Sequence, residues 1–176
     1  LRVYALILLG ERQLEQHHLT VARLAFEQAL RGARRAGSSY LEQRTLIGLI
    51  ETAVADGEPE WALDLAGVAG DLDRPTPALA ESLALAYLAN SRETTAQRWV
   101  DVAAAAGTSL RQAWVQARID LAHGQLVDAE RRCADAVEHF ARSSPSRDER
   151  ALWITRVAVA EALGDRSLAA ICLAEV

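Results

Sequence analysis

Five alanines recur at one distance from five turn residues, and this repeat constrains the fold more than any other feature of the sequence. Each alanine follows by five residues a residue that opens a turn between two helical segments. The turn residues are His17, Gly57, Ser91, Gly124 and Gly164, and the alanines are Ala22, Ala62, Ala96, Ala129 and Ala169. Successive turn residues are 40, 34, 33 and 40 positions apart. A period of this length across a whole chain predicts a stack of similar helical units.

The apolar residues on either side of each turn recur with helical spacing, so each unit is predicted to hold two helices. No alternating Val and Ile pattern and no Asn-Gly turn indicates strands. The 176 residues suit one domain. We therefore expect an all-α fold, with a single helical-repeat domain over residues 1–176. The expected units cover about residues 1–37, 38–72, 76–107, 109–143 and 146–176.

Capping signals mark several of the predicted helix ends. Ser39 with Glu42 has the spacing of a capping box, as does Ser146 with Glu149. Thr76 followed by proline is a good N-cap and first-turn pair.

The first unit resembles a tetratricopeptide repeat. The pattern is carried by Leu6, Leu9, Gly10, Ala22, Phe26, Ala29 and Leu30. This resemblance covers essentially the whole chain through the repeated alanines. It implies a right-handed superhelical solenoid of about five helix–turn–helix units, with a role in binding other proteins.

Two short stretches, Ala55–Ala62 and Ala162–Asp165, are similar to the helical repeat regions of large bacterial LuxR-type regulators, the relatives of the maltose-regulon activator. In that family an ATPase region precedes the repeats and a DNA-binding helix-turn-helix follows them. The similarity implies that this chain is a fragment of a larger signalling or transcription regulator. The chain has no Gly-rich phosphate loop and no recognition helix, so the ATPase and the DNA contact would lie outside it.

In tetratricopeptide proteins the first helix of each unit lines a concave groove, and the resemblance implies which residues would lie there. They are Tyr4, Ile7, Glu11 and Leu14 in the first unit; Arg44, Ile47, Glu51 and Val54 in the second; Glu81, Leu85 and Leu88 in the third; Arg111, Trp114, Arg118 and Leu121 in the fourth; and Ile154, Ala158 and Glu161 in the fifth.

Trp114 is the candidate anchor of this groove, because Arg111 and Arg118 lie on the same helix face. An indole beside two guanidinium groups could bind an acidic peptide that carries a large apolar residue. The alternative interpretation is that Trp114 packs against a neighbouring helix, and the sequence leaves both open. The carboxylate clamp of chaperone-binding members needs lysine, and this chain has none.

Charge and motif content narrow the function classes. The net charge is −5 and all 19 basic residues are arginine, scattered among acidic residues, which disfavours direct nucleic-acid binding. No catalytic motif and no metal-ligand spacing occurs, so we expect no enzyme activity, no cofactor and no metal. Cys133 and Cys172 lie in apolar helical patterns, which suggests small buried residues in a cytoplasmic protein. No stretch is long and apolar enough for a membrane span.

The leading functional hypothesis is a non-enzymatic protein-interaction or sensor module that binds a partner segment in the groove. Two alternatives remain: a small-molecule effector domain of a LuxR-type activator, and a stand-alone assembly scaffold. A closed pocket would favour a small ligand, and an open trough would favour a peptide or protein.

Overall fold

The computed structural model describes residues 1–70, 72, 74–105, 107, 109–140 and 147–176. These residues form ten α-helices and no strand. The helices are α1 (Arg2–Glu15), α2 (Leu19–Arg35), α3 (Ser39–Ala55), α4 (Pro59–Gly70), α5 (Pro77–Ala89), α6 (Glu93–Ala104), α7 (Leu110–Ala122), α8 (Leu126–Phe140), α9 (Arg147–Leu163) and α10 (Arg166–Leu173). The chain divides into two compact parts, Leu1–Ala103 and Ala104–Val176. These parts are called unit 1 and unit 2 below, and each is larger than one of the predicted repeat units.

The residue that the repeat places in the turn of each helix pair adopts the left-handed conformation. All five turn residues have positive φ, from 53° at Ser91 to 75° at Gly164. In the first turn, the N–H of His17 donates to the carbonyl of Leu14 at 3.0 Å, and that of His18 donates to Gln13 at 2.8 Å. This pair of bonds is the Schellman arrangement, which satisfies the last carbonyls of a helix. The first helix of every pair ends one or two residues before the turn residue that the repeat indicates.

The helix starts confirm one capping prediction and correct another. The Thr76 hydroxyl accepts a hydrogen bond from the Leu79 N–H, as predicted. The N-cap of α3 is Ser38, which accepts from the Leu41 N–H, and not Ser39. Glu42 consequently lies one position too far along for a capping box, and its carboxylate instead pairs with Arg34 at 2.8 Å. The predicted cap at Ser146 lies outside the described residues.

The five repeat alanines are all buried, which confirms the helical phase. Ala22, Ala62, Ala96 and Ala129 have no exposed surface, and Ala169 is 8% exposed. A side chain of one carbon allows the two helices of a pair to approach closely.

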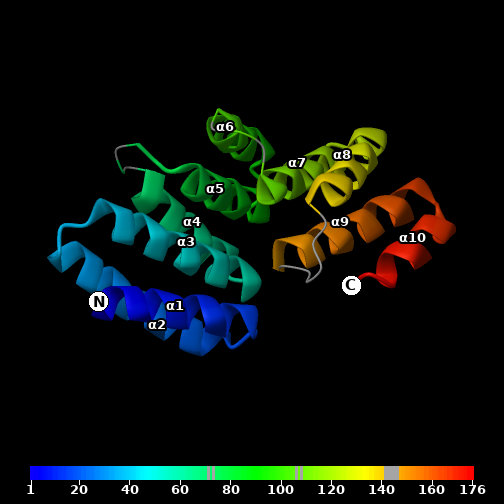
Figure 1. The fold of residues 1–176 in the computed structure, drawn as a ribbon. Helices are drawn as coiled ribbons and strands as arrows, with labels where there is room; N and C mark the ends of the chain where they lie inside the picture. Colours follow the sequence, from blue (N-terminus) through cyan, green and yellow to red (C-terminus); the bar gives the residue numbers. More distant parts are fainter. Residues whose placement is uncertain (71, 73, 106, 108, 141–146) are drawn as a thin grey trace. The chain divides into compact units, whose positions relative to one another are not determined.

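Unit 1 is built as successive helix pairs that pack on one another (Figure 1). Phe26 of α2 is fully buried, and its ring lies against Gly10 of α1 and Gly48 of α3. A Cβ atom at Gly10 would lie 2.7 Å from this ring, and one at Gly48 would lie 2.3 Å from it. A second apolar cluster joins α3, α4 and α5 around Leu46, Leu79 and Leu83, and Trp99 of α6 packs against it.

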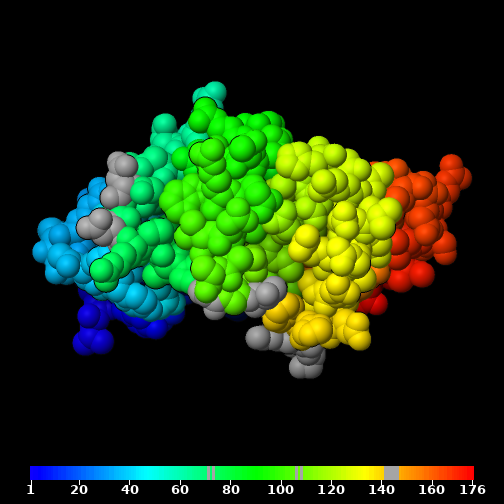
Figure 2. Space-filling model, turned by 90° about the horizontal axis from the view of Figure 1, so that it is seen from above, coloured from blue at the N-terminus to red at the C-terminus, as the bar shows by residue number. Residues whose placement is uncertain are grey.

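Unit 2 contains α7 to α10, in which α8 and α9 each pack against α7. Its apolar cluster consists of Ala113 and Ala117 of α7, Cys133 and Ala136 of α8, and Leu152 of α9. In unit 2, α8 lies on the face that the space-filling view shows and is coloured yellow (Figure 2). The small residues of this apolar cluster determine how closely α7 and α8 can approach each other.

The contact between Phe26 and Gly48 can be tested with two matched glycine-to-alanine substitutions. Gly48→Ala places a methyl group inside the volume of the Phe26 ring, and we expect it to destabilise the protein by about 1–3 kcal/mol. Gly67 is an exposed residue of α4, and a Cβ there meets nothing within 4 Å. Gly67→Ala should stabilise the protein by roughly 0.5–1 kcal/mol through helix propensity. Urea unfolding followed by circular dichroism measures both; equal effects would contradict the packing described.

Candidate functional site

The α1 helix presents only part of the predicted groove set. Ile7 is fully buried and Leu14 is 5% exposed, so both belong to the core and cannot contact a partner in this structure. Both residues belong to one apolar cluster with Phe26 of α2 and Leu49 of α3. Together with Gly10 they form the buried stripe of α1. Glu11 remains accessible beside that stripe.

The α3 helix is in contact with α1, α2, α4 and α5. It is therefore more buried than a helix that lines an open groove, as predicted, would be. Glu51 is 8% exposed, and its Oε1 accepts a hydrogen bond from the Ser82 hydroxyl of α5 at 3.2 Å. It is a buried helix-to-helix contact and not a groove residue. Ile47 and Val54 are half-buried and pack against the core. Arg44 keeps an accessible guanidinium group.

The predicted groove residues of α5 are also buried. Glu81, Leu85 and Leu88 are 7%, 2% and 8% exposed. Every residue from 79 to 86 is buried, because this helix is apolar around almost its whole circumference. A helix of that kind contributes to the core on all faces, so repeat phase alone cannot assign it an open side.

An accessible aromatic surface does exist on α1 and α3, and we call it the Tyr4–Tyr40 face. It consists of Tyr4, Leu8, Glu11, Tyr40 and Arg44. Tyr4, Leu8 and Tyr40 are 45%, 46% and 62% exposed. Sequence reasoning missed Leu8 and Tyr40, although Tyr4 and Leu8, like Tyr40 and Arg44, have the i, i+4 spacing that aligns residues on one helix face.

An ion pair holds this face together. Arg44 donates from Nε and Nη2 to the two carboxylate oxygens of Glu11, each at 2.9 Å. Its guanidinium carbon lies 4.9 Å from the centre of the Tyr4 ring. Burial acts to lower the pKa of Arg44, but hydrogen bonds with Tyr4, Glu11 and Tyr40 outweigh it and raise that pKa above its ordinary value. Bidentate geometry and cation–π contact orient the exposed rings.

In unit 2 the three predicted anchor residues are already engaged in contacts. Arg111 donates to both carboxylate oxygens of Asp148 at 3.1 and 3.2 Å. Trp114 is half-buried, and its indole N–H donates to the Thr155 hydroxyl of α9 at 3.0 Å. The Arg118 guanidinium lies 5.9 Å from the Trp114 ring, and burial lowers the pKa of Arg118. These contacts favour the interpretation in which Trp114 packs between helices.

The remaining predicted residues of unit 2 lie on α7 and α9. Ile154 is 56% exposed and Glu161 is exposed as well, whereas Leu121 and Ala158 are half-buried. Of the predicted residues, α9 therefore offers one exposed apolar side chain, Ile154, and one exposed carboxylate, Glu161.

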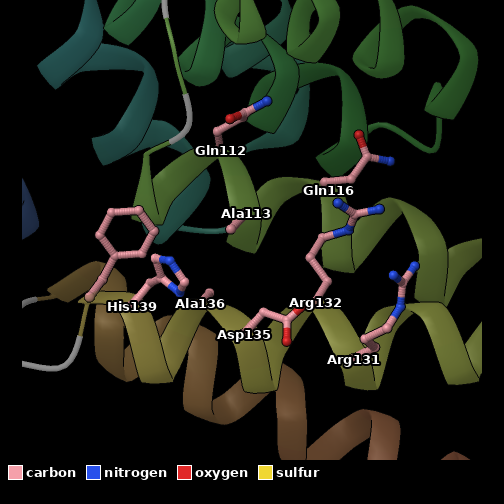
Figure 3. A pocket seen from close by; sticks show the side chains of 9 residues that line it. Gln112, Ala113, Gln116, Arg131, Arg132, Asp135, Ala136 and His139 are labelled. Atoms are coloured by element: carbon pink, nitrogen blue, oxygen red, sulfur yellow. The ribbon is translucent and has the colours of Figure 1, made fainter.

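A pocket of about 380 Å³ lies on the other side of α7, between α7 and α8. Its lining residues are Gln112, Ala113, Gln116, Arg131, Arg132, Asp135, Ala136, His139 and Phe140 (Figure 3). Arg131 pairs with Asp128 and Arg132 with Asp120, so both cations have internal partners. The Oε1 atom of Gln112 is buried and accepts no hydrogen bond from a described residue. The sequence did not indicate this pocket, because its residues come from both helices of one pair.

Chemically reactive groups are few in the described part of the chain. No cluster of three or more His, Cys, Asp or Glu side chains suits a metal ion there. Burial raises the pKa of the Cys133 thiol to about 12, and burial also raises that of Cys172. Both thiols are therefore protonated near neutral pH and poor nucleophiles. None of the helices among the described residues could cross a bilayer.

Comparison with known proteins identifies the class of fold. Neither the protein-family models nor the curated proteins contain a match to this sequence. The structure is similar to the crystal structure of a tetratricopeptide repeat protein from Parabacteroides merdae, with a TM-score of 0.67 and 18% sequence identity. The match covers 99% of this chain and 64% of that protein, so the chain spans less than two thirds of its length. The fold is an all-α, tetratricopeptide-like helical repeat.

The contact between Trp114 and Thr155 can be measured with a double-mutant cycle. Thr155→Val removes the acceptor and leaves the indole N–H of the half-buried Trp114 without this partner, so we expect a loss of about 1–3 kcal/mol. Trp114→Phe removes the donor, and the double variant should lose less than the sum of the two single variants. Chemical unfolding monitored by circular dichroism reports each free energy. Additive losses would show that the hydrogen bond does not stabilise α7 against α9.

Proposed function

We propose that this chain is a non-enzymatic protein-interaction module that binds a segment of a partner protein on the Tyr4–Tyr40 face. The observation that carries the proposal is the gathering of two exposed tyrosines and an exposed leucine around an internally neutralised ion pair. Tyrosine is enriched among the residues that dominate binding energy at protein interfaces.

The chemistry of this face points to the kind of segment it would bind. The Arg44 charge is offset by Glu11, so the face has no net charge to demand a charged partner. Tyr4, Leu8 and Tyr40 offer exposed apolar surface, and the side chains of the two tyrosines form hydrogen bonds with Arg44. A partner segment with one or two large apolar side chains and free backbone polar groups would match it.

The wider context in our proposal is a bacterial signalling or transcription regulator. It is supported by the similarity of Ala55–Ala62 and Ala162–Asp165 to the repeat regions of LuxR-type regulators. In such a regulator the module would work in the cytoplasm and would not itself contact DNA. A stand-alone assembly scaffold would use the same face.

A second candidate function is the binding of a small effector, and the pocket between α7 and α8 favours it. Its volume of about 380 Å³ lies within the range of small-molecule sites. Gln112 is one of the residues that line this pocket, so a substitution there tests whether a ligand binds in it. A library of neutral and weakly charged metabolites, screened by thermal shift, tests this candidate; stabilisation by one compound that Gln112→Leu abolishes would support it.

The main proposal is tested by selecting binders from a random peptide library and measuring their affinities. We expect Tyr40→Ala and Tyr4→Ala each to weaken the selected peptides by tenfold or more, as interface aromatics do. Both side chains are substantially exposed, so unfolding free energies should change by less than about 0.5 kcal/mol. Fluorescence anisotropy gives the dissociation constants.

Two control variants make the peptide experiment specific. Tyr40→Phe keeps the ring and should retain most of the affinity. Val68 of α4 is 48% exposed and lies outside the face, so Val68→Ala should leave binding unchanged. Peptides whose affinity is insensitive to both tyrosine substitutions would contradict the proposal.

A further inference from the structure

A second pocket, of about 390 Å³, lies between α1 and α2 on unit 1. Arg2 of α1 and Arg31 and Arg35 of α2 line it together with Gln28. On α2, Gln28, Arg31 and Arg35 are spaced i, i+3 and i+7, which places them on one helix face. No acidic residue is among the lining residues.

The balance of charges in residues 1–38 explains why Arg2, Arg31 and Arg35 have no carboxylate partner. The segment contains six arginines and three glutamates, a net charge of +3, whereas the rest of the chain has 13 arginines and 21 acidic residues, a net charge of −8. All three glutamates form ion pairs with other arginines: Glu11 with Arg44, Glu15 with Arg12 and Glu27 with Arg23.

The pocket arginines are therefore left without a carboxylate. Of the other arginines on these two helices, Arg34 pairs with Glu42. None of Arg2, Arg31 and Arg35 forms an ion pair with a described residue. The three excess positive charges of the segment thus lie around one pocket, an exception to the scattered arginines that the sequence suggested.

The α1 and α2 helices pack closely beneath the pocket that the three arginines line. Gly32 lies between Arg31 and Arg35, and a Cβ atom on it would lie 2.6 Å from Cγ2 of Val3. The two helices are thus in direct contact here, and Val3 and Leu6 form an apolar floor. The Nε of Arg35 donates to the Arg31 carbonyl at 3.2 Å, which restrains its side chain along α2. Positive charges that line one pocket repel one another, and a bound anion would offset this repulsion.

We infer that this pocket binds a small oxyanion with two or more negative charges, such as a di- or polyphosphate or a polycarboxylate. Guanidinium groups bind both phosphate and carboxylate oxygens through paired N–H donors. The volume is that of a small-molecule site, and the apolar floor accommodates a short carbon skeleton. The site lies on residues distinct from the Tyr4–Tyr40 face, and it does not depend on the proposed function.

Isothermal titration calorimetry at low ionic strength, about 20 mM NaCl to limit screening, tests the inference with inorganic pyrophosphate and with citrate. We expect at least one probe to bind, to raise the thermal midpoint through linkage, and to bind at least tenfold more weakly to the Arg31→Gln, Arg35→Gln double variant. The stronger probe distinguishes phosphate from carboxylate chemistry.

The matched control is the Arg92→Gln, Arg98→Gln double variant, which changes the net charge equally at exposed positions of the same unit. It should retain the wild-type affinity. Both double variants should show wild-type helix content by circular dichroism. The inference is overturned if neither probe binds at millimolar concentration, or if the two double variants lose affinity equally, since the second result would mean attraction by overall charge. Loss of peptide binding by the tyrosine variants is independent of either result.

Discussion

The contact between one aromatic ring and two glycines determines how the first helices of unit 1 can be arranged. Phe26 fills the space that side chains at Gly10 and Gly48 would otherwise occupy. The ring thereby joins α1, α2 and α3, and the spacing between these helices depends on both glycines. Two surfaces of these helices remain accessible outside this packing. One is the Tyr4–Tyr40 face on α1 and α3, and the other is the pocket between α1 and α2 that Arg2, Arg31 and Arg35 line.

The fold could be predicted from the sequence because it depends on short-range backbone chemistry. Gly57, Gly124 and Gly164 tolerate the left-handed turns, and the buried alanines permit close helix pairs. These signals lie within a few residues of each other, so a single sequence displays them. The misplacement of the α3 cap by one residue shows their limit, since Ser38 and Ser39 are chemically equivalent until the helix start is known.

The candidate site was harder to predict because accessibility is a property of several helices at once. Ile7 and Tyr4 are both apolar residues of α1, but one is fully buried and the other is 45% exposed. Repeat phase assigns a residue to a helix, and only the neighbouring helices decide whether it faces solvent. Trp114 illustrates the same point, because its partner Thr155 lies 41 residues away on α9.

Two of the five turns carry a side chain where glycine would be unstrained. His17 and Ser91 have φ values of 60° and 53°, and such a conformation costs a residue with a Cβ atom roughly 1–2 kcal/mol. That strain lowers the free energy needed to open the α1–α2 and α5–α6 junctions locally. Native-state hydrogen exchange should consequently be uneven along the chain. Amide protons at the His17 and Ser91 turns will exchange through small local fluctuations. Those at the glycine turns will exchange only through larger openings of the structure.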